Sequence, residues 1–174
     1  MRLAAMLCIT VLAGASPALA QDNPYSAAAK QTLGLIKGNV VKAAEQMSEE
    51  NYAFKPTADV RSFGQLIGHI ANANFMICSR ASGAANPNTG DIEKTKTAKA
   101  DLTKALADSF AFCEAQFDAM TGAKGAEIID LFGMKMPRLN ALQFNTAHDF
   151  EHYGNIVTYM RLKGMVPPSS QRGM

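Results

Sequence analysis

Three histidines are the residues of this chain best suited to chemistry. His148 and His152 stand four positions apart in one segment with helical periodicity, and His69 lies in another. Side chains at positions i and i+4 share a face of an α-helix, with Cβ atoms roughly 6 Å apart, so two imidazoles can reach one ion. Neutral imidazole binds zinc, nickel, copper and ferrous iron well. His69 is the one other imidazole that could complete a three-nitrogen metal site.

A site with three protein nitrogens is open, because it leaves a coordination position for water or substrate. Glu151, beside the pair, is the carboxylate that could act as a general base, although we expect it to point outward as Asp149 does. The alternative is that all three histidines are ordinary hydrogen-bonded side chains. Ligand histidines need partners for their second ring nitrogen, and five nearby side chains could serve: Asn72, Asn145, Glu151, Asn155 and Tyr159.

Four segments with helical spacing of apolar residues must position these histidines. The pattern predicts helices over residues 25–47, 62–80, 97–120 and 137–162. Ser62 is a suitable N-cap for the second helix, and Pro137 suits the first turn of the fourth. For residues 126–136 the sequence predicts a short hairpin or an irregular lid. The sequence therefore predicts an all-α fold, a four-helix bundle.

The long loop between the second and third helices bears on the topology. Residues 81–95 are rich in Ser, Gly, Asn and Pro, and an extended chain of that length can span a bundle of about 30 Å at roughly 3.3 Å per residue. The two helices can therefore run parallel. In that case Cys78 and Cys113 come level and could form a disulfide. Otherwise the two cysteines are buried thiols that pack as small apolar side chains.

The first twenty residues have the pattern of a secretory signal peptide. Arg2 is followed by an apolar stretch over residues 3–14, and Ala18 and Ala20 form an A-x-A-type cleavage site. We expect cleavage at this site to leave residues 21–174 as a single domain, periplasmic or secreted and without a membrane span. An exported protein is also in an environment where disulfides persist.

Composition excludes several classes of function. The chain has 17 basic and 15 acidic residues and no tryptophan, so we expect no nucleic-acid partner. It contains no glycine-rich phosphate loop and no G-x-S-x-G nucleophile elbow. These absences leave the histidines as the principal chemical signal.

The order and spacing of three motifs resemble the DinB/YfiT-like superfamily. They are Phe-Gly-Gln-Leu-Ile-Gly-His-Ile at residues 63–70, His-Asp-Phe-Glu-His-Tyr-Gly-Asn at 148–155, and Leu-Lys-Gly-Met-Val-Pro-Pro-Ser at 162–169. The resemblance implies an up-down-down-up bundle with a long crossover between helices two and three. It also implies a divalent metal ion, zinc or nickel before manganese or iron, with His69, His148 and His152 as its ligands.

The resemblance favours a metal-dependent enzyme of the hydrolase or thiol-transferase type. Its ion would activate water or a small thiol, its substrate would be a small molecule, and Glu151 would be the candidate catalytic residue. The alternatives are a non-catalytic, metal-stabilised stress or interaction protein, and a helical interaction module with a vestigial site. Relatives of this kind often form dimers, so a homodimer is also expected.

Overall fold

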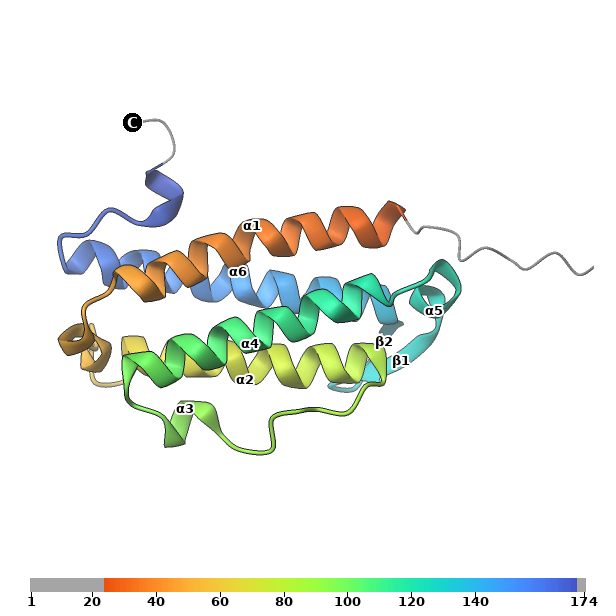
Figure 1. Cartoon of the computed structure of the whole chain (residues 1–174), viewed down its shortest axis with the longest axis horizontal. Coiled ribbons are helices and arrows are strands. Elements are labelled where there is room, and N and C mark those ends of the chain that lie inside the picture. Colours follow the sequence, from red (N-terminus) through yellow and green to blue (C-terminus); the bar gives the residue numbers. More distant parts are fainter. Residues whose placement is uncertain (1–23, 172–174) are drawn as a thin grey trace, which may run out of the picture.

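The computed structural model describes residues 24–171, and the predicted signal peptide at residues 1–20 lies outside this range. Four long helices form the bundle: α1 (Pro24–Gln46), α2 (Phe63–Ser82), α4 (Lys99–Asp118) and α6 (Arg138–Leu162) (Figure 1). The connecting elements are η1 (Glu49–Ala53), α3 (Ile92–Thr95), α5 (Gly122–Ala126), β1 (Ile128–Leu131), β2 (Met134–Pro137) and η2 (Pro168–Ser170). No helix in this range is long and apolar enough to cross a membrane.

The course of the chain is up-down-down-up, as predicted. Helices α2 and α4 run parallel, joined by a crossover that passes along the outside of the bundle and contains α3, while α1 and α6 run the other way (Figure 1). Helix α2 packs against α4 and α6, and α1 packs against the same two helices. This arrangement puts α2 and α6, which carry the three histidines, side by side.

Local signals fix the ends of α2. The Ser62 side chain accepts a hydrogen bond from the Gln65 amide at 3.1 Å, and the Gln65 side chain accepts one from the Ser62 amide at 2.9 Å. This reciprocal capping box confirms Ser62 as the predicted N-cap. The helix ends at Ser82, and Gly83 caps it with a φ of 77°, a backbone conformation that favours glycine.

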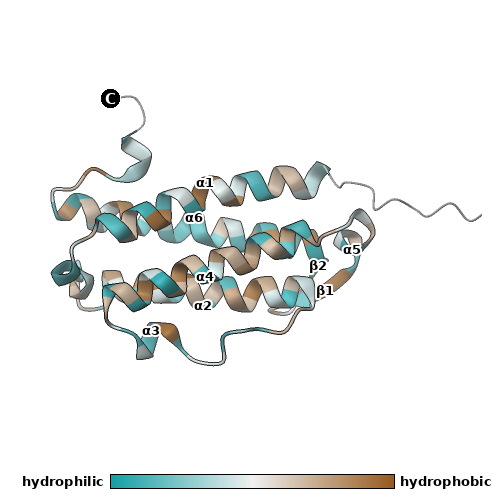
Figure 2. Cartoon of the chain, viewed as in Figure 1, coloured by the Kyte–Doolittle hydropathy of each residue, from teal (hydrophilic) through white to brown (hydrophobic). Residues whose placement is uncertain are grey.

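Apolar side chains from all four long helices fill the core. Figure 2 shows hydrophobic residues along α2 and α4 and a paler, more polar α6. The largest fully buried side chains are Phe63, Phe110, Leu33, Ile36, Met47, Ile67, Ile70, Ile77, Leu102, Leu106, Leu131 and Leu142.

A disulfide joins Cys78 of α2 to Cys113 of α4. Both residues are fully buried, and their Cα atoms lie 5.4 Å apart. The parallel course of the two helices brings the cysteines level. Of the two alternatives for the cysteines, the bridged one is therefore observed.

The segment predicted as a hairpin or a lid is a two-stranded antiparallel hairpin. Strands β1 and β2 pair from Ile128 opposite Pro137 to Leu131 opposite Met134. Phe132 and Gly133 make the turn with positive φ, and Asp130 accepts a hydrogen bond from the Gly133 amide at 2.8 Å. The hairpin leads directly into α6 and so sets where that helix begins.

Candidate metal centre

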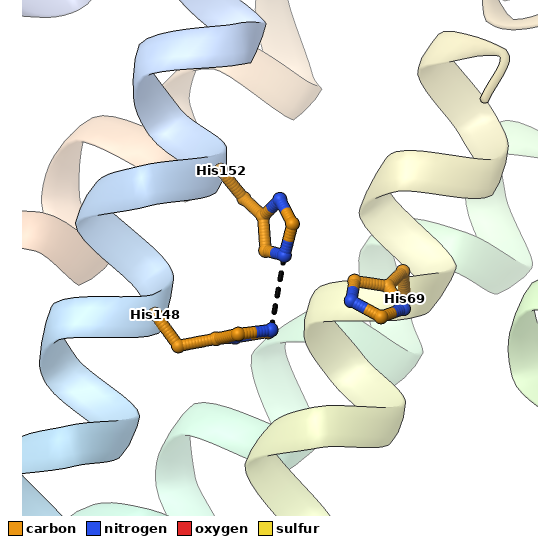
Figure 3. A group of neighbouring side chains, drawn as sticks. All are labelled: His69, His148 and His152. Carbon is orange, nitrogen blue, oxygen red and sulfur yellow. Dashed lines mark hydrogen bonds between the residues drawn. The ribbon is translucent and has the colours of Figure 1, made fainter. Parts of the chain in front are cut away.

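The structure brings the three predicted histidines together. His148 and His152 project from α6 toward His69 on α2 (Figure 3). One ring nitrogen from each histidine lies within 4.8 Å of the other two, which is a spacing that could hold a metal ion. The ring centroid of His69 lies 4.7 Å from that of His152 and 5.2 Å from that of His148.

The distance between the paired histidines suits a shared ion. The Nε2 atoms of His148 and His152 lie 2.9 Å apart. Two nitrogens bound to one tetrahedral zinc ion stand about 3.3 Å apart, so a shift of a few tenths of an ångström would admit the ion. The other ring nitrogen of His148, Nδ1, is buried without a hydrogen-bond partner among the described residues. The ring of His148 is therefore engaged at Nε2, which faces the shared point.

The surroundings keep the pair in the form that binds metals. Burial, followed by the charges of His148, His69 and Arg61, lowers the pKa of His152 to about 3. Burial also lowers the pKa of His148, with a smaller contribution from the charge of His69. Both imidazoles are therefore neutral near pH 7, and each neutral ring has one nitrogen whose lone pair can bind a metal ion.

His69 is oriented by an acid that the sequence analysis did not identify. Its Nδ1 lies 3.1 Å from Oε2 of Glu93, whose Oε1 accepts a hydrogen bond from Arg61 Nε at 2.8 Å. Because an ionised carboxylate only accepts hydrogen bonds, it fixes the proton of His69 on Nδ1. Nε2 of His69 is then left with a lone pair that could bind an ion. A carboxylate behind a histidine in this way is a common support for a metal ligand.

The crossover between α2 and α4 places Glu93 beside His69. Helix α3 lies so close to α2 that a Cβ atom at Gly68 would stand 2.8 Å from Glu93 Cα. Asn72 of α2 holds the same segment, because its side chain donates to Asp91 at 2.8 Å and accepts from the Ile92 amide at 3.0 Å. Glu93 is 24 residues from His69, and the one local hint in the sequence is Asp91 as an N-cap.

The structure places the other predicted partners of the histidines in different positions. Asn155 lies with its side-chain amide 3.4 Å from Nδ1 of His152, where it was expected. The Tyr159 hydroxyl instead donates to the backbone carbonyl of Arg61 at 2.6 Å. Glu151 is exposed, and its negative charge acts to raise the pKa of His148, opposing the effect of burial. Asn72 secures the crossover as described above, and Asn145 belongs to a separate polar cluster.

The expectation that Asp149 points outward is wrong. Asp149 is fully buried and accepts a hydrogen bond from the Asn145 side chain at 3.3 Å. It lies one turn after Asn145, on the face of α6 that packs into the bundle. Burial raises its pKa well above the usual range of a carboxyl group. A charged residue type suggested the surface, whereas the helical phase of α6 places this one inside.

Residues 36–156 match the DinB superfamily. The chain belongs to this superfamily. The uncharacterised protein YjoA of Bacillus subtilis is 28% identical over 127 residues, which cover 70% of this chain and 79% of YjoA.

Solved DinB-like structures have the same fold. One from Bacillus cereus superposes with a TM-score of 0.71 at 19% identity, covering 79% of this chain and 92% of that one. The structure of YjoA itself gives a TM-score of 0.64 at 24% identity, covering 82% and 99%. At these identities the likeness concerns the fold, which in this DinB chain brings the three histidines together.

A cleft of about 680 Å³ adjoins His152 of this DinB bundle. His152, Asn155 and Tyr159 form its α6 wall, and Arg61 and Glu93 also line it. The remaining lining residues are Lys55, Pro56, Ala58, Asp59, Val60, Gln65, Leu66 and Thr158. A small molecule in the cleft would therefore contact one of the three histidines directly.

Proposed function

We propose that this DinB protein binds a divalent metal ion through His69, His148 and His152 and acts as a metal-dependent enzyme on a small molecule. The observation that carries the proposal is the convergence of three imidazoles, with one nitrogen each within 4.8 Å of the others. A divalent ion in such a site lowers the pKa of water or of a thiol and so supplies a nucleophile near pH 7. The reaction would be of the hydrolase or thiol-transferase type.

The residues around the histidines have separable roles in this proposal. Glu93 holds the proton of His69 on Nδ1 and so presents Nε2 to the ion. Asn155 steadies the ring of His152. Glu151 is the candidate general base on α6, although it faces solvent and does not line the cleft. The cleft beside His152 is the entry for the substrate.

The ligand set narrows the choice of ion. Three imidazoles without a carboxylate ligand suit zinc or nickel better than magnesium or calcium, which prefer oxygen ligands. Manganese and iron are the next candidates. The predicted signal peptide supports export to the periplasm or the medium, and the Cys78–Cys113 disulfide agrees with an oxidising compartment.

Elemental analysis of residues 21–174, purified without a histidine tag, tests the site. We expect about one zinc or nickel ion per chain, and its loss in His69→Ala and in His152→Ala. Gln143→Ala, an exposed change on the same helix as His152, is the matched control and should keep the ion. If no metal binds after incubation with zinc, nickel and manganese, or if both histidine variants retain it, the ligand assignment is wrong.

A second function is favoured because the three histidines come from two different helices. An ion bound to His69 and to the pair on α6 would tie α2 to α6 and could serve stability alone. Chelation separates the two functions. A loss of turnover with the fold retained supports the enzyme, whereas a metal-dependent melting temperature without turnover on hydrolase and thiol-transfer substrates supports the non-catalytic protein.

A further inference from the structure

We propose that the ligand of the cleft beside the three histidines carries a carboxylate, which Arg61 binds while a second group of the same molecule reaches the metal position. This inference rests on the metal centre proposed above and names the class of its ligand. It follows from the contacts of Arg61, from the charges that line the cleft and from the charge of the centre itself.

Arg61 is held in place but keeps binding capacity. Its Nε donates to Glu93 at 2.8 Å, and its backbone carbonyl accepts the Tyr159 hydroxyl at 2.6 Å. No described residue accepts a hydrogen bond from its two Nη atoms, and the side chain is 43% exposed in the wall of the cleft. A guanidinium edge of this kind binds a carboxylate through two parallel hydrogen bonds.

The other charges near Arg61 favour an anion. Lys55 lines the same cleft, and none of the ion pairs among the described residues involves it. Glu93 is already shared between Arg61 and His69, so its charge is partly compensated. Asp59 is the remaining acid in the wall and opposes the two cations.

The centre adds positive charge. Three neutral imidazoles do not compensate a divalent cation, so a loaded site carries a net charge of about +2 before any ligand enters. A cleft that has Arg61 and Lys55 in its wall and would have a cation bound beside His152 concentrates small anions. The expected ligand is therefore bifunctional, with a metal-binding group at one end and a carboxylate at the other.

Two thiols of equal carbon number provide the test. The mature chain loaded with cobalt(II) is titrated with 3-mercaptopropionate and, separately, with the uncharged 3-mercapto-1-propanol. The absorption of the cobalt–thiolate bond reports binding. Both thiols offer sulfur to the ion. We expect the carboxylate thiol to bind about tenfold more tightly, as for one charge-assisted pair in a half-exposed position.

Variants of Arg61 test whether this residue causes the preference for the carboxylate thiol. Arg61→Gln should bring the ratio of the two affinities to about one, and Arg61→Lys should keep part of the preference. Arg161→Gln, an exposed change at the end of α6 away from the cleft, is the matched control and should behave as the unaltered protein.

The outcomes separate this inference from the proposed function. Equal affinities for the two thiols in the cobalt-loaded protein, or a preference that survives in Arg61→Gln, overturn the carboxylate inference alone. A protein that takes up no cobalt overturns the metal centre and this inference together.

Discussion

Two polar clusters in the helix bundle differ in their exposure and in the arrangement of their polar atoms. The histidine cluster, His69, His148 and His152, reaches the open cleft through His152. In the amide cluster the four side chains of Asn74, Ser109, Asn145 and Asp149 are fully buried. In the histidine cluster, ring nitrogens converge on one point, with His148 and His152 Nε2 atoms 2.9 Å apart. In the amide cluster, hydrogen-bond donors and acceptors pair with one another in a chain.

The amide cluster binds helices to one another. The Asn145 side chain donates to Asn74 at 2.8 Å, and the Asn74 side chain donates to Ser109 of α4 at 3.1 Å. The Asn145 amide also lies 3.8 Å from the sulfur of Cys113, beside the disulfide. Polar side chains shielded from water occur in both clusters, although among the histidines only His152 is buried and the other two are half-buried. The convergence of lone pairs on one point is what distinguishes a candidate ligand site from a structural network.

The largest expected effect is metal-dependent stabilisation through the histidine cluster. At a free metal concentration a thousandfold above the dissociation constant, binding should raise the free energy of unfolding by about 4 kcal/mol. Denaturant unfolding of residues 21–174 with metal and with a chelator measures the gain. His148→Ala should abolish it, whereas Asn145→Ala should keep it. Equal stability with and without metal would contradict the site.

Loss of the disulfide is expected to have the second largest effect on stability. Replacing Cys78 and Cys113 together by Ser should lower the free energy of unfolding by about 2–4 kcal/mol, because the crosslink restricts the unfolded chain. Denaturant unfolding under non-reducing conditions measures this loss. Metal stoichiometry should not change. A parallel loss of metal would show that the crosslink also holds the histidine cluster together.

Asn145→Ala should destabilise the protein by about 1–3 kcal/mol, since it leaves buried polar atoms of Asn74 and Asp149 without their partner. Thermal unfolding of the apoprotein measures the effect. Gln143→Ala on the exposed face of the same helix should stay within about 0.5 kcal/mol of the unaltered protein. Equal stability of both variants would mean that the amide cluster does not hold the helices together.

The smallest effect is expected at Glu93, behind the histidine cluster. Glu93→Gln keeps an oxygen that can accept from His69 but loses the negative charge, and it should weaken metal binding about tenfold, or roughly 1.4 kcal/mol. Competition with a coloured chelator measures the affinity. Gly68→Ala, which pushes the backbone of Glu93 away from α2, should act in the same direction. Unchanged affinity in both variants would remove Glu93 from the support of His69.

Periodicity and chain breakers were enough to predict most of this fold. The helices match the predicted segments to within two residues, and the loop before α4 was long enough for the parallel crossover that makes the cysteines level. The histidines could be identified as a candidate site because the i and i+4 spacing of His148 and His152 places both on one face of a helix. These features depend on local sequence and on simple lengths.

Long-range packing determined what the sequence did not show. Glu93 reaches His69 because a short helix lies against α2, and no periodic pattern marks such a contact. Asp149 was expected outside because of its charge, yet α6 turns it toward Asn145 in the interior. Both residues owe their positions to contacts between elements, and such contacts leave little trace in one sequence.

The close approach at Gly68 has a consequence for recognising related sites. A larger residue at that position would lift the crossover from the helix and withdraw its acid from the neighbouring histidine. A glycine directly before the α2 histidine, together with an acid after the first residue of the crossover helix, therefore forms a sequence signature. Chains that have both should possess the buttressed histidine, and chains with a bulky residue at the glycine position should have to support their metal ligand in some other way.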